Sequence, residues 1–248
     1  CMLYLREDGL RKGPLRGLLT LHIDDEGATG FPEVLETLAS EMSKQYGEVK
    51  LQKDMFRHIG HELRQTWGLD GSVTLTDSQE FYTETIAPVD IPVGVAKATL
   101  LNEPQKSDLR RLNGEMSYGN DCRPDAMGRI ALSLQSMDEN AAVEHLHQAN
   151  AALEILQDPV AVKHLTFMPM EISKLKLVAV GDAALRKKST KYSQGCYYIV
   201  LMEVNEGHTG GYCHVLDFKS KRATRVSKSS MGAEVLILVR ASEALQKV

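Results

Sequence analysis

The sequence predicts an α+β protein, because helical and strand-like patterns occupy different parts of the chain. Apolar residues from Phe31 to Tyr46 recur at spacings of three and four, the period of an amphipathic helix. Residues 141–156 are rich in Ala and Leu and contain neither Gly nor Pro, which favours a second helix. The last third instead contains three short apolar stretches separated by turns, a pattern typical of strands.

The first part of the chain is predicted to consist mainly of strands around one helix. Residues 1–5 and 15–23 form a hairpin by pattern, since a polar turn over 9–13 separates them. Gly27 and Gly30 are expected to break the chain before the helix, which Gly47 then ends. Two or three antiparallel strands come next, in the stretches 49–51, 55–63 and 72–75, with a turn over 68–71 and a Pro-containing extended segment reaching Val95.

The middle of the chain is predicted to be helical, and the end to be a sheet followed by a helix. The predicted helices are 107–118, 125–137 and 141–156, and the predicted strands are 175–180, 197–204 and 212–218. Basic connections cover 185–193 and 219–228. Ser229 or Ser230 is expected to cap a final helix that runs from Gly232 towards Leu245.

Composition excludes several classes of protein. Among the 248 residues, 43% are hydrophobic and 25% charged, which excludes a disordered tail, a collagen-like repeat and a coiled-coil rod. The net charge of -4 excludes a uniformly basic nucleic-acid coat but permits a local basic groove. The four cysteines form no CxxC pair, so zinc ribbons and thioredoxin-like sites are excluded. No apolar run approaches the ~20 residues that span a bilayer, and we expect a soluble intracellular protein without membrane partners.

Asp24 and Asp25 are the first candidate site, at the end of an apolar strand. Neighbouring side chains on a strand point to opposite faces, but a tight turn after the strand can bring both carboxylates to one locus. Two carboxylates suit Mg²⁺, which prefers oxygen ligands. The alternative is that the two residues only open a solvent-exposed turn, where Asp is common, and composition alone favours that interpretation.

Asp182 and Glu234 are the second candidate pair, one ending a predicted strand and the other starting the final helix. If three antiparallel strands pack under that helix, Glu234 can approach the strand that carries Asp182. Carboxylates gathered from different elements repel each other unless a cation neutralises them. The alternative is two unrelated surface acids, which spacing alone favours.

Basic residues flank the second pair and are the candidate nucleic-acid contacts. A basic rim around an acidic metal site would suit a nucleic-acid backbone. The alternative is a pair of solvated loops. The candidate residues are Arg186, Lys187, Lys188, Lys219, Lys221 and Arg222.

Residues 17–25, GLLTLHIDD, resemble the strand and double-Asp motif of reverse transcriptases, with His22 in place of the usual aromatic residue. The segments 31–47, 47–50 and 56–60 resemble the region after this motif in the polyproteins of copia-type LTR retrotransposons, where a helix leads to a hairpin that grips the primer. Residues 70–75, with Gln79 and Tyr82, continue the resemblance.

The rest of the chain resembles later parts of the same polyproteins in the same order. Residues 109–118 and 123–125 resemble the segment that links polymerase to ribonuclease H. Asp182, residues 220–221 and residues 229–234 resemble the ribonuclease H-like domain of this family. Each matching segment is short. The resemblance to this family is specific because the segments follow one another in the family's order across nearly the whole chain.

The resemblance implies an assignment for both acidic pairs. Asp24 and Asp25 would belong to the polymerase metal site, and Asp182 and Glu234 to the ribonuclease H metal site, each site using paired Mg²⁺ ions. It implies a palm end with a thumb-like hairpin over 1–90, a helical connection over 91–170 and a truncated ribonuclease H-like mixed sheet with a helix over 171–248. The implied partners are an RNA template, an RNA–DNA hybrid, dNTP and the remainder of the polyprotein, in a cytoplasmic particle or the nucleus.

The departures from the family pattern lead to three hypotheses. The polymerase site also requires an Asp from an earlier strand, and the ribonuclease H site a further Asp from a later one, while Ala183 and Ala184 stand where a second acid often occurs. Because residue 1 is Cys, we expect a chain cut from a longer polyprotein. We therefore expect an inactive remnant of an element. The alternatives are a part of a longer active polyprotein and a retained nucleic-acid-binding or scaffold protein.

Overall fold

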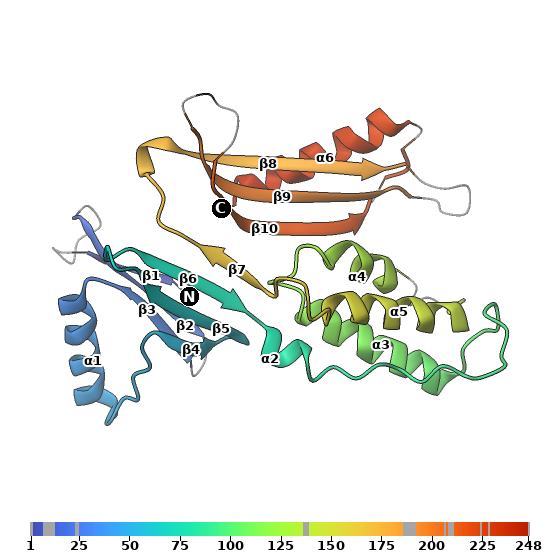
Figure 1. Ribbon diagram of the computed structural model, residues 1–248, viewed down its shortest axis with the longest axis horizontal. Helices are drawn as coiled ribbons and strands as arrows, with labels where there is room; N and C mark the ends of the chain where they lie inside the picture. Colours follow the sequence, from blue (N-terminus) through green and yellow to red (C-terminus); the bar gives the residue numbers. More distant parts are fainter. Residues whose placement is uncertain are drawn as a thin grey trace. The chain divides into compact units, whose positions relative to one another are not determined.

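The computed structural model in Figure 1 confirms the α+β class, with helices and antiparallel sheets. It describes residues 2–6, 13–22, 25–135, 139–185, 192–205, 207, 211–223, 225–227 and 229–247. The chain divides into two compact units, Cys1–Thr66 and Trp67–Val248.

The first unit contains a three-stranded antiparallel sheet with the order β1-β2-β3. Its strands are β1 (Met2–Arg6), β2 (Leu15–His22) and β3 (Asp25–Gly30), so the predicted hairpin is confirmed. The expected chain break over Gly27 and Gly30 is wrong, because both residues belong to β3. At Gly30 a Cβ would lie 2.6 Å from the Arg16 carbonyl oxygen, so glycine here allows two strands to approach closely.

Helix α1 (Pro32–Tyr46) confirms the predicted amphipathic helix of the first unit. Pro32 stands at the first helical turn, where its missing N–H has no cost. Arg16 of β2 contacts both sides of the helix start, since it pairs with Glu33 at 2.6 Å and its guanidinium lies 4.0 Å from the centre of the Phe31 ring. Gly47 follows the helix with a φ of 91°, which explains its end there.

The predicted single strand 55–63 is wrong, because the chain reverses within it. Strands β4 (Met55–His58) and β5 (His61–Trp67) form an antiparallel hairpin in which His58 pairs with His61. The two turn residues, Ile59 and Gly60, have φ values of 50° and 77°, the sign that a type I′ turn requires at both positions. The predicted strand 49–51 is also absent, since this stretch is irregular.

The second unit begins with β6 (Val73–Ser78) and α2 (Glu80–Thr83) and continues into three helices. These helices are α3 (Glu103–Tyr118), α4 (Met127–Leu134) and α5 (Val143–Leu156), which confirms the three predicted helices with shifted ends. Their apolar faces meet in one buried cluster, so the hydrophobic effect holds the helices together. The largest fully buried members are Leu109, Leu112, Met116, Ile130, Leu146 and Leu156.

Half-buried amide side chains hold the extended stretch that precedes α3. Asn150 of α5 accepts a hydrogen bond from the Val89 N–H and donates one to its carbonyl oxygen, at 3.0 and 2.8 Å. Gln157 donates to the carbonyl oxygens of Thr83 and Ile86. Each amide replaces the backbone partners that this irregular segment lacks, so the segment is held without being helix or strand.

A four-residue strand, β7 (His164–Phe167), pairs antiparallel with β6, and the sequence pattern did not indicate it. After it, the Met168 N–H donates to Nε2 of the buried His214, which makes that nitrogen an acceptor and the imidazole neutral. Burial lowers the pKa of His214, in agreement with this neutral form.

The second unit ends with an antiparallel sheet of order β10-β9-β8 and a helix. After the turn η1 (Ile172–Lys174), the elements are β8 (Leu175–Ala184), β9 (Gln194–Glu203), β10 (Cys213–Arg222) and α6 (Ser230–Leu245). The predicted strands are confirmed, but β8 is longer and β10 includes 219–222, which the sequence assigned to a basic connection. Ser229 accepts from the Gly232 N–H and caps α6 as predicted.

Helix α6 lies on one face of this sheet, over β8 and β9 (Figure 1). Its buried side chains are Ala233, Ile237 and Ala241. The opposite face of the sheet contacts the helices, since the Tyr198 hydroxyl donates to the Pro124 carbonyl oxygen at 3.2 Å. Among the helices that the structure describes, none has the length and apolar character needed to cross a membrane.

Candidate metal and nucleic-acid site

The first candidate pair falls at the junction of β2 and β3. The register of these strands ends with His22 opposite Asp25, so the chain reverses its direction between them. Asp24 lies outside the described residues, and of Asp25 the structure describes the backbone, as the first residue of β3. Asp25 therefore begins the strand that returns alongside β2, and a shared locus for the two carboxylates stays a prediction.

Asp182 lies near the end of β8, on the edge strand of the last sheet. It pairs with Cys196 of β9, and its side chain is exposed. One carboxylate oxygen accepts a hydrogen bond of 2.8 Å from the Ala183 N–H. The remaining oxygen lone pairs face solvent, which leaves the carboxylate able to bind a cation.

The neighbours of Asp182 show which face of the sheet meets α6. A Cβ on Gly181 would lie 2.9 Å from Cγ2 of Ile237, and a Cβ on Gly195 only 2.0 Å from its Cδ1. Both glycines therefore face α6 and allow the helix backbone to approach the sheet. Because side chains alternate along a strand, Asp182 points to the opposite face of β8 from Gly181.

Glu234 is exposed in the first turns of α6. The helix contacts β8 and β9, and its residues follow one another at about 100° around the axis. Around the helix axis, Glu234 therefore lies to one side of the buried Ile237, and Arg240 and Lys247 lie to the other side. Arg240 and Lys247 line a groove together with residues of β9 and β10, so the opposite flank, which carries Glu234, is turned towards β8, the strand of Asp182. The structure thus brings the two elements together, with the carboxylates on different faces of the edge strand.

The basic candidates separate into three groups. Arg186, Lys187 and Lys188 lie outside the described residues. Lys219 and Lys221 are exposed on β10 and pair with Tyr197 and Gly195 of β9, so both lie on the α6 face.

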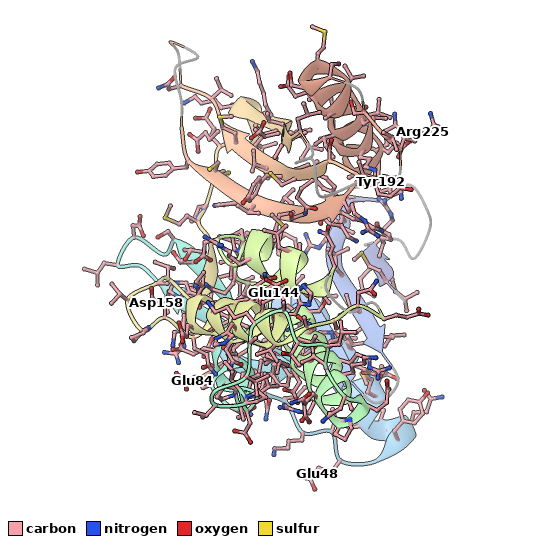
Figure 2. All side chains as sticks on the ribbon, turned by 90° about the vertical axis from the view of Figure 1, so that its right-hand side faces the viewer. Glu48, Glu84, Glu144, Asp158, Tyr192 and Arg225 are labelled. Carbon is pink, nitrogen blue, oxygen red and sulfur yellow. The ribbon has the colours of Figure 1, made fainter. Side chains whose placement is uncertain are left out.

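Arg222 lies on the other face, and its guanidinium lies 5.4 Å from the centre of the Tyr192 ring. Figure 2 shows Tyr192 and Arg225 at this end of the sheet, where the connections leave β10 and enter β9. The cation–π contact with Tyr192 gives the Arg222 guanidinium a partner within the protein. Arg222 therefore differs from Lys219 and Lys221 both in its contacts and in the face of the sheet on which it lies.

A groove between α6 and β10 was not indicated by the sequence pattern. Gly195 and Ile237 lie in it together with Tyr197, Asp217 and several cations, and its cavity volume is about 430 Å³. The Tyr197 hydroxyl donates to Asp217 at 3.2 Å, and burial followed by the Asp217 charge raises the pKa of this tyrosine. Lys219 and Lys221 are two residues apart in the sequence, and this spacing places them on one face only because 219–222 belong to β10 rather than to a connection.

No protein-family model, no curated protein and no solved structure matches this chain. The chemical interpretation of the site therefore depends on its residues and geometry.

Proposed function

We propose that the chain is a part of the polyprotein of a copia-type retrotransposon, joining the end of an RNA-directed DNA polymerase to a ribonuclease H-like domain. Asp24 and Asp25 belong to the polymerase metal site, and Asp182 and Glu234 to the ribonuclease H metal site. The isolated chain neither extends a primer nor cleaves a hybrid, and its partners in the complete protein are template RNA, RNA–DNA hybrid and dNTP.

One observation carries this proposal: three consecutive antiparallel strands are followed by a helix on one face, with Asp182 on the edge strand and Glu234 on the flank of α6 nearest to it. Both side chains are exposed at an edge of the sheet. Because the Asp182 carboxylate and α6 lie on different faces of β8, the proposal requires Glu234 to reach past this edge of the sheet to share a cation with Asp182.

The residue types suit Mg²⁺, because carboxylate oxygens are its preferred protein ligands and exposed carboxylates leave room for the waters that the ion retains. When bound, the ion stabilises the charge that develops on the phosphate during hydrolysis. Asp182 and Glu234 would hold it. The Ala183 N–H orients the Asp182 carboxylate through its 2.8 Å hydrogen bond, which leaves the second carboxylate oxygen for the ion.

A second candidate is a retained nucleic-acid-binding or scaffold protein without catalysis. The observation that favours it is the pair of exposed lysines on β10, Lys219 and Lys221, neither of which has an ion pair among the described residues. In this case binding to RNA–DNA hybrid depends on salt and survives both Asp24→Asn and Glu234→Gln.

The two functions predict different effects of Mg²⁺ on hybrid binding. We expect Mg²⁺, at constant ionic strength, to tighten binding of a labelled RNA–DNA hybrid about fivefold, equivalent to ~1 kcal/mol. The Asp182→Asn/Glu234→Gln variant should lose this increment, because it lacks both ligands. Fluorescence anisotropy measures the affinity.

The matched control is Asp108→Asn/Glu154→Gln, which removes two exposed acids from α3 and α5. This control should keep the increment. An increment that persists in the Asp182→Asn/Glu234→Gln variant, or binding that never responds to Mg²⁺, would contradict the proposed metal site and favour the non-catalytic function. Primer extension by the isolated chain would contradict the proposed inactivity.

A further inference from the structure

The groove between α6 and β10 has a floor of packed side chains and walls with an excess of positive charge. Gly195 has no side chain, so Ile237 packs directly against β9 and the two residues form the floor of the groove. Four cationic and two acidic side chains line it, which gives a local excess of two positive charges in a chain of net charge -4. These side chains are Lys219, Lys221, Arg240 and Lys247, with Asp217 and Glu243.

The acids of the groove leave its lysines without partners. Asp217 accepts from the Tyr197 hydroxyl at 3.2 Å. Among the described residues, Lys219, Lys221 and Lys247 form no ion pair within 4.0 Å, although each lines the same cavity as the two acids. Unpaired cations that converge on a concave surface focus a positive potential and attract an anionic ligand.

The spacing of these cations indicates the kind of anion. Lys219 and Lys221 are two residues apart on one face of β10, which separates them by ~6.7 Å. This is close to the separation of consecutive phosphates along a nucleic-acid strand. Arg240 and Lys247 lie on the opposite wall, on one flank of α6. Cations along two walls suit a linear polyanion that runs through the groove better than a single compact anion.

We propose that the α6 groove binds the phosphate backbone of a nucleic-acid strand, with Lys219 and Lys221 contacting consecutive phosphates. This inference rests on the proposed function for the identity of the partner. It goes beyond that function because the groove lies on the flank of α6 opposite to Glu234, and Asp182 faces the other side of the sheet. The groove is therefore a second contact for the strand, independent of Mg²⁺ and of the carboxylate pair.

The test measures binding of a labelled deoxythymidine oligonucleotide in EDTA, over a range of salt concentrations. We expect Lys219→Gln/Lys221→Gln to weaken binding roughly 10- to 30-fold at about 0.1 M salt, since each phosphate contact on a single strand contributes ~0.7 to the slope of log K against log salt. The slope itself should fall by about 1.4 for the two contacts. The control, Lys97→Gln/Lys176→Gln, removes two exposed lysines outside the groove and should change neither quantity by a comparable amount.

Two results would overturn the groove proposal. One is a loss of affinity and of salt slope that is no larger in Lys219→Gln/Lys221→Gln than in the control. A parent chain that does not bind the oligonucleotide at all would count as the same result. The other is lysine-dependent binding of dTTP without binding of the oligonucleotide, which would show a nucleotide site rather than a strand site. Circular dichroism spectra that match the parent chain verify that each variant is folded. Because the assay contains EDTA, its outcome is separate from the Mg²⁺ increment that tests the proposed function.

Discussion

We expect Arg123→Met to lower the free energy of unfolding of the second unit by about 3–5 kcal/mol, the usual cost of removing one member of a buried charged network. The side chain of Arg123 is only 3% exposed. Its guanidinium binds the Asp125 carboxylate through two hydrogen bonds, of 2.8 and 2.7 Å. It also donates to the carbonyl oxygens of Ile155 and Leu156, at the end of α5.

The expected size of the effect comes from the groups that the substitution leaves unpaired. Without Arg123, the Leu156 carbonyl oxygen loses a buried donor, and the Ile155 carbonyl oxygen keeps backbone partners, such as the Asp158 N–H at 3.4 Å. A buried polar group that is left unpaired costs about 1–3 kcal/mol. Lysine should not restore stability, because a single ammonium lacks the planar fork that reaches a carboxylate and two carbonyls together. Arg123 also holds the pKa of Asp125 below its usual range, mainly through their hydrogen bonds.

Urea unfolding followed by circular dichroism measures this prediction. Arg129→Met is the matched control, because Arg129 is an exposed residue of the adjoining helix α4. It should change stability by less than ~0.5 kcal/mol, as surface substitutions usually do. A loss below about 1 kcal/mol for Arg123→Met would show that Arg123 does not hold the end of α5 through these contacts.

The second large effect is expected for Leu146→Ala, which should lower the free energy of unfolding by about 2–5 kcal/mol. Leu146 lies in the middle of the buried helical cluster and is 0% exposed. Truncation removes apolar contacts and leaves a cavity that the surrounding helices α3, α4 and α5 fill only partly.

Leu132→Ala is the control for burial, since Leu132 belongs to α4 but is 48% exposed. The same chemical change should cost far less there. Equal losses of stability in the two variants, measured by urea unfolding, would contradict the position of Leu146 in the core.

Periodicity predicted the elements whose apolar pattern is long. The helices 31–46 and 141–156 and the three strands of the last sheet all appear in the structure, since each buries one regular face. Short or locally unusual elements were missed. The hairpin turn at Ile59 and Gly60 places a β-branched residue at positive φ, which sequence rules disfavour. Strand β7 has four residues and depends on a partner, β6, distant in the sequence.

The candidate site was predictable only to the level of its elements. The sequence placed Asp182 on a strand and Glu234 in the first turns of a helix, both of which the structure has. It could not reveal the groove, because that depends on the close approach of Gly195 and Ile237, which lie far apart in the sequence. Likewise, the segment 123–125 stood out only as part of a resemblance, and its buried contacts with α5 come from tertiary structure.

The proposed metal site is tested most directly by locating the bound ion. Mn²⁺ replaces Mg²⁺, and NMR spectra record the paramagnetic broadening of backbone amide signals near the ion. The proposal predicts that the signals of residues 181–183 and 229–234 broaden first as Mn²⁺ is added, and that Asp182→Asn/Glu234→Gln abolishes this selectivity. Broadening that is uniform, that centres on other acids, or that persists unchanged in the variant would contradict a metal site formed by Asp182 and Glu234.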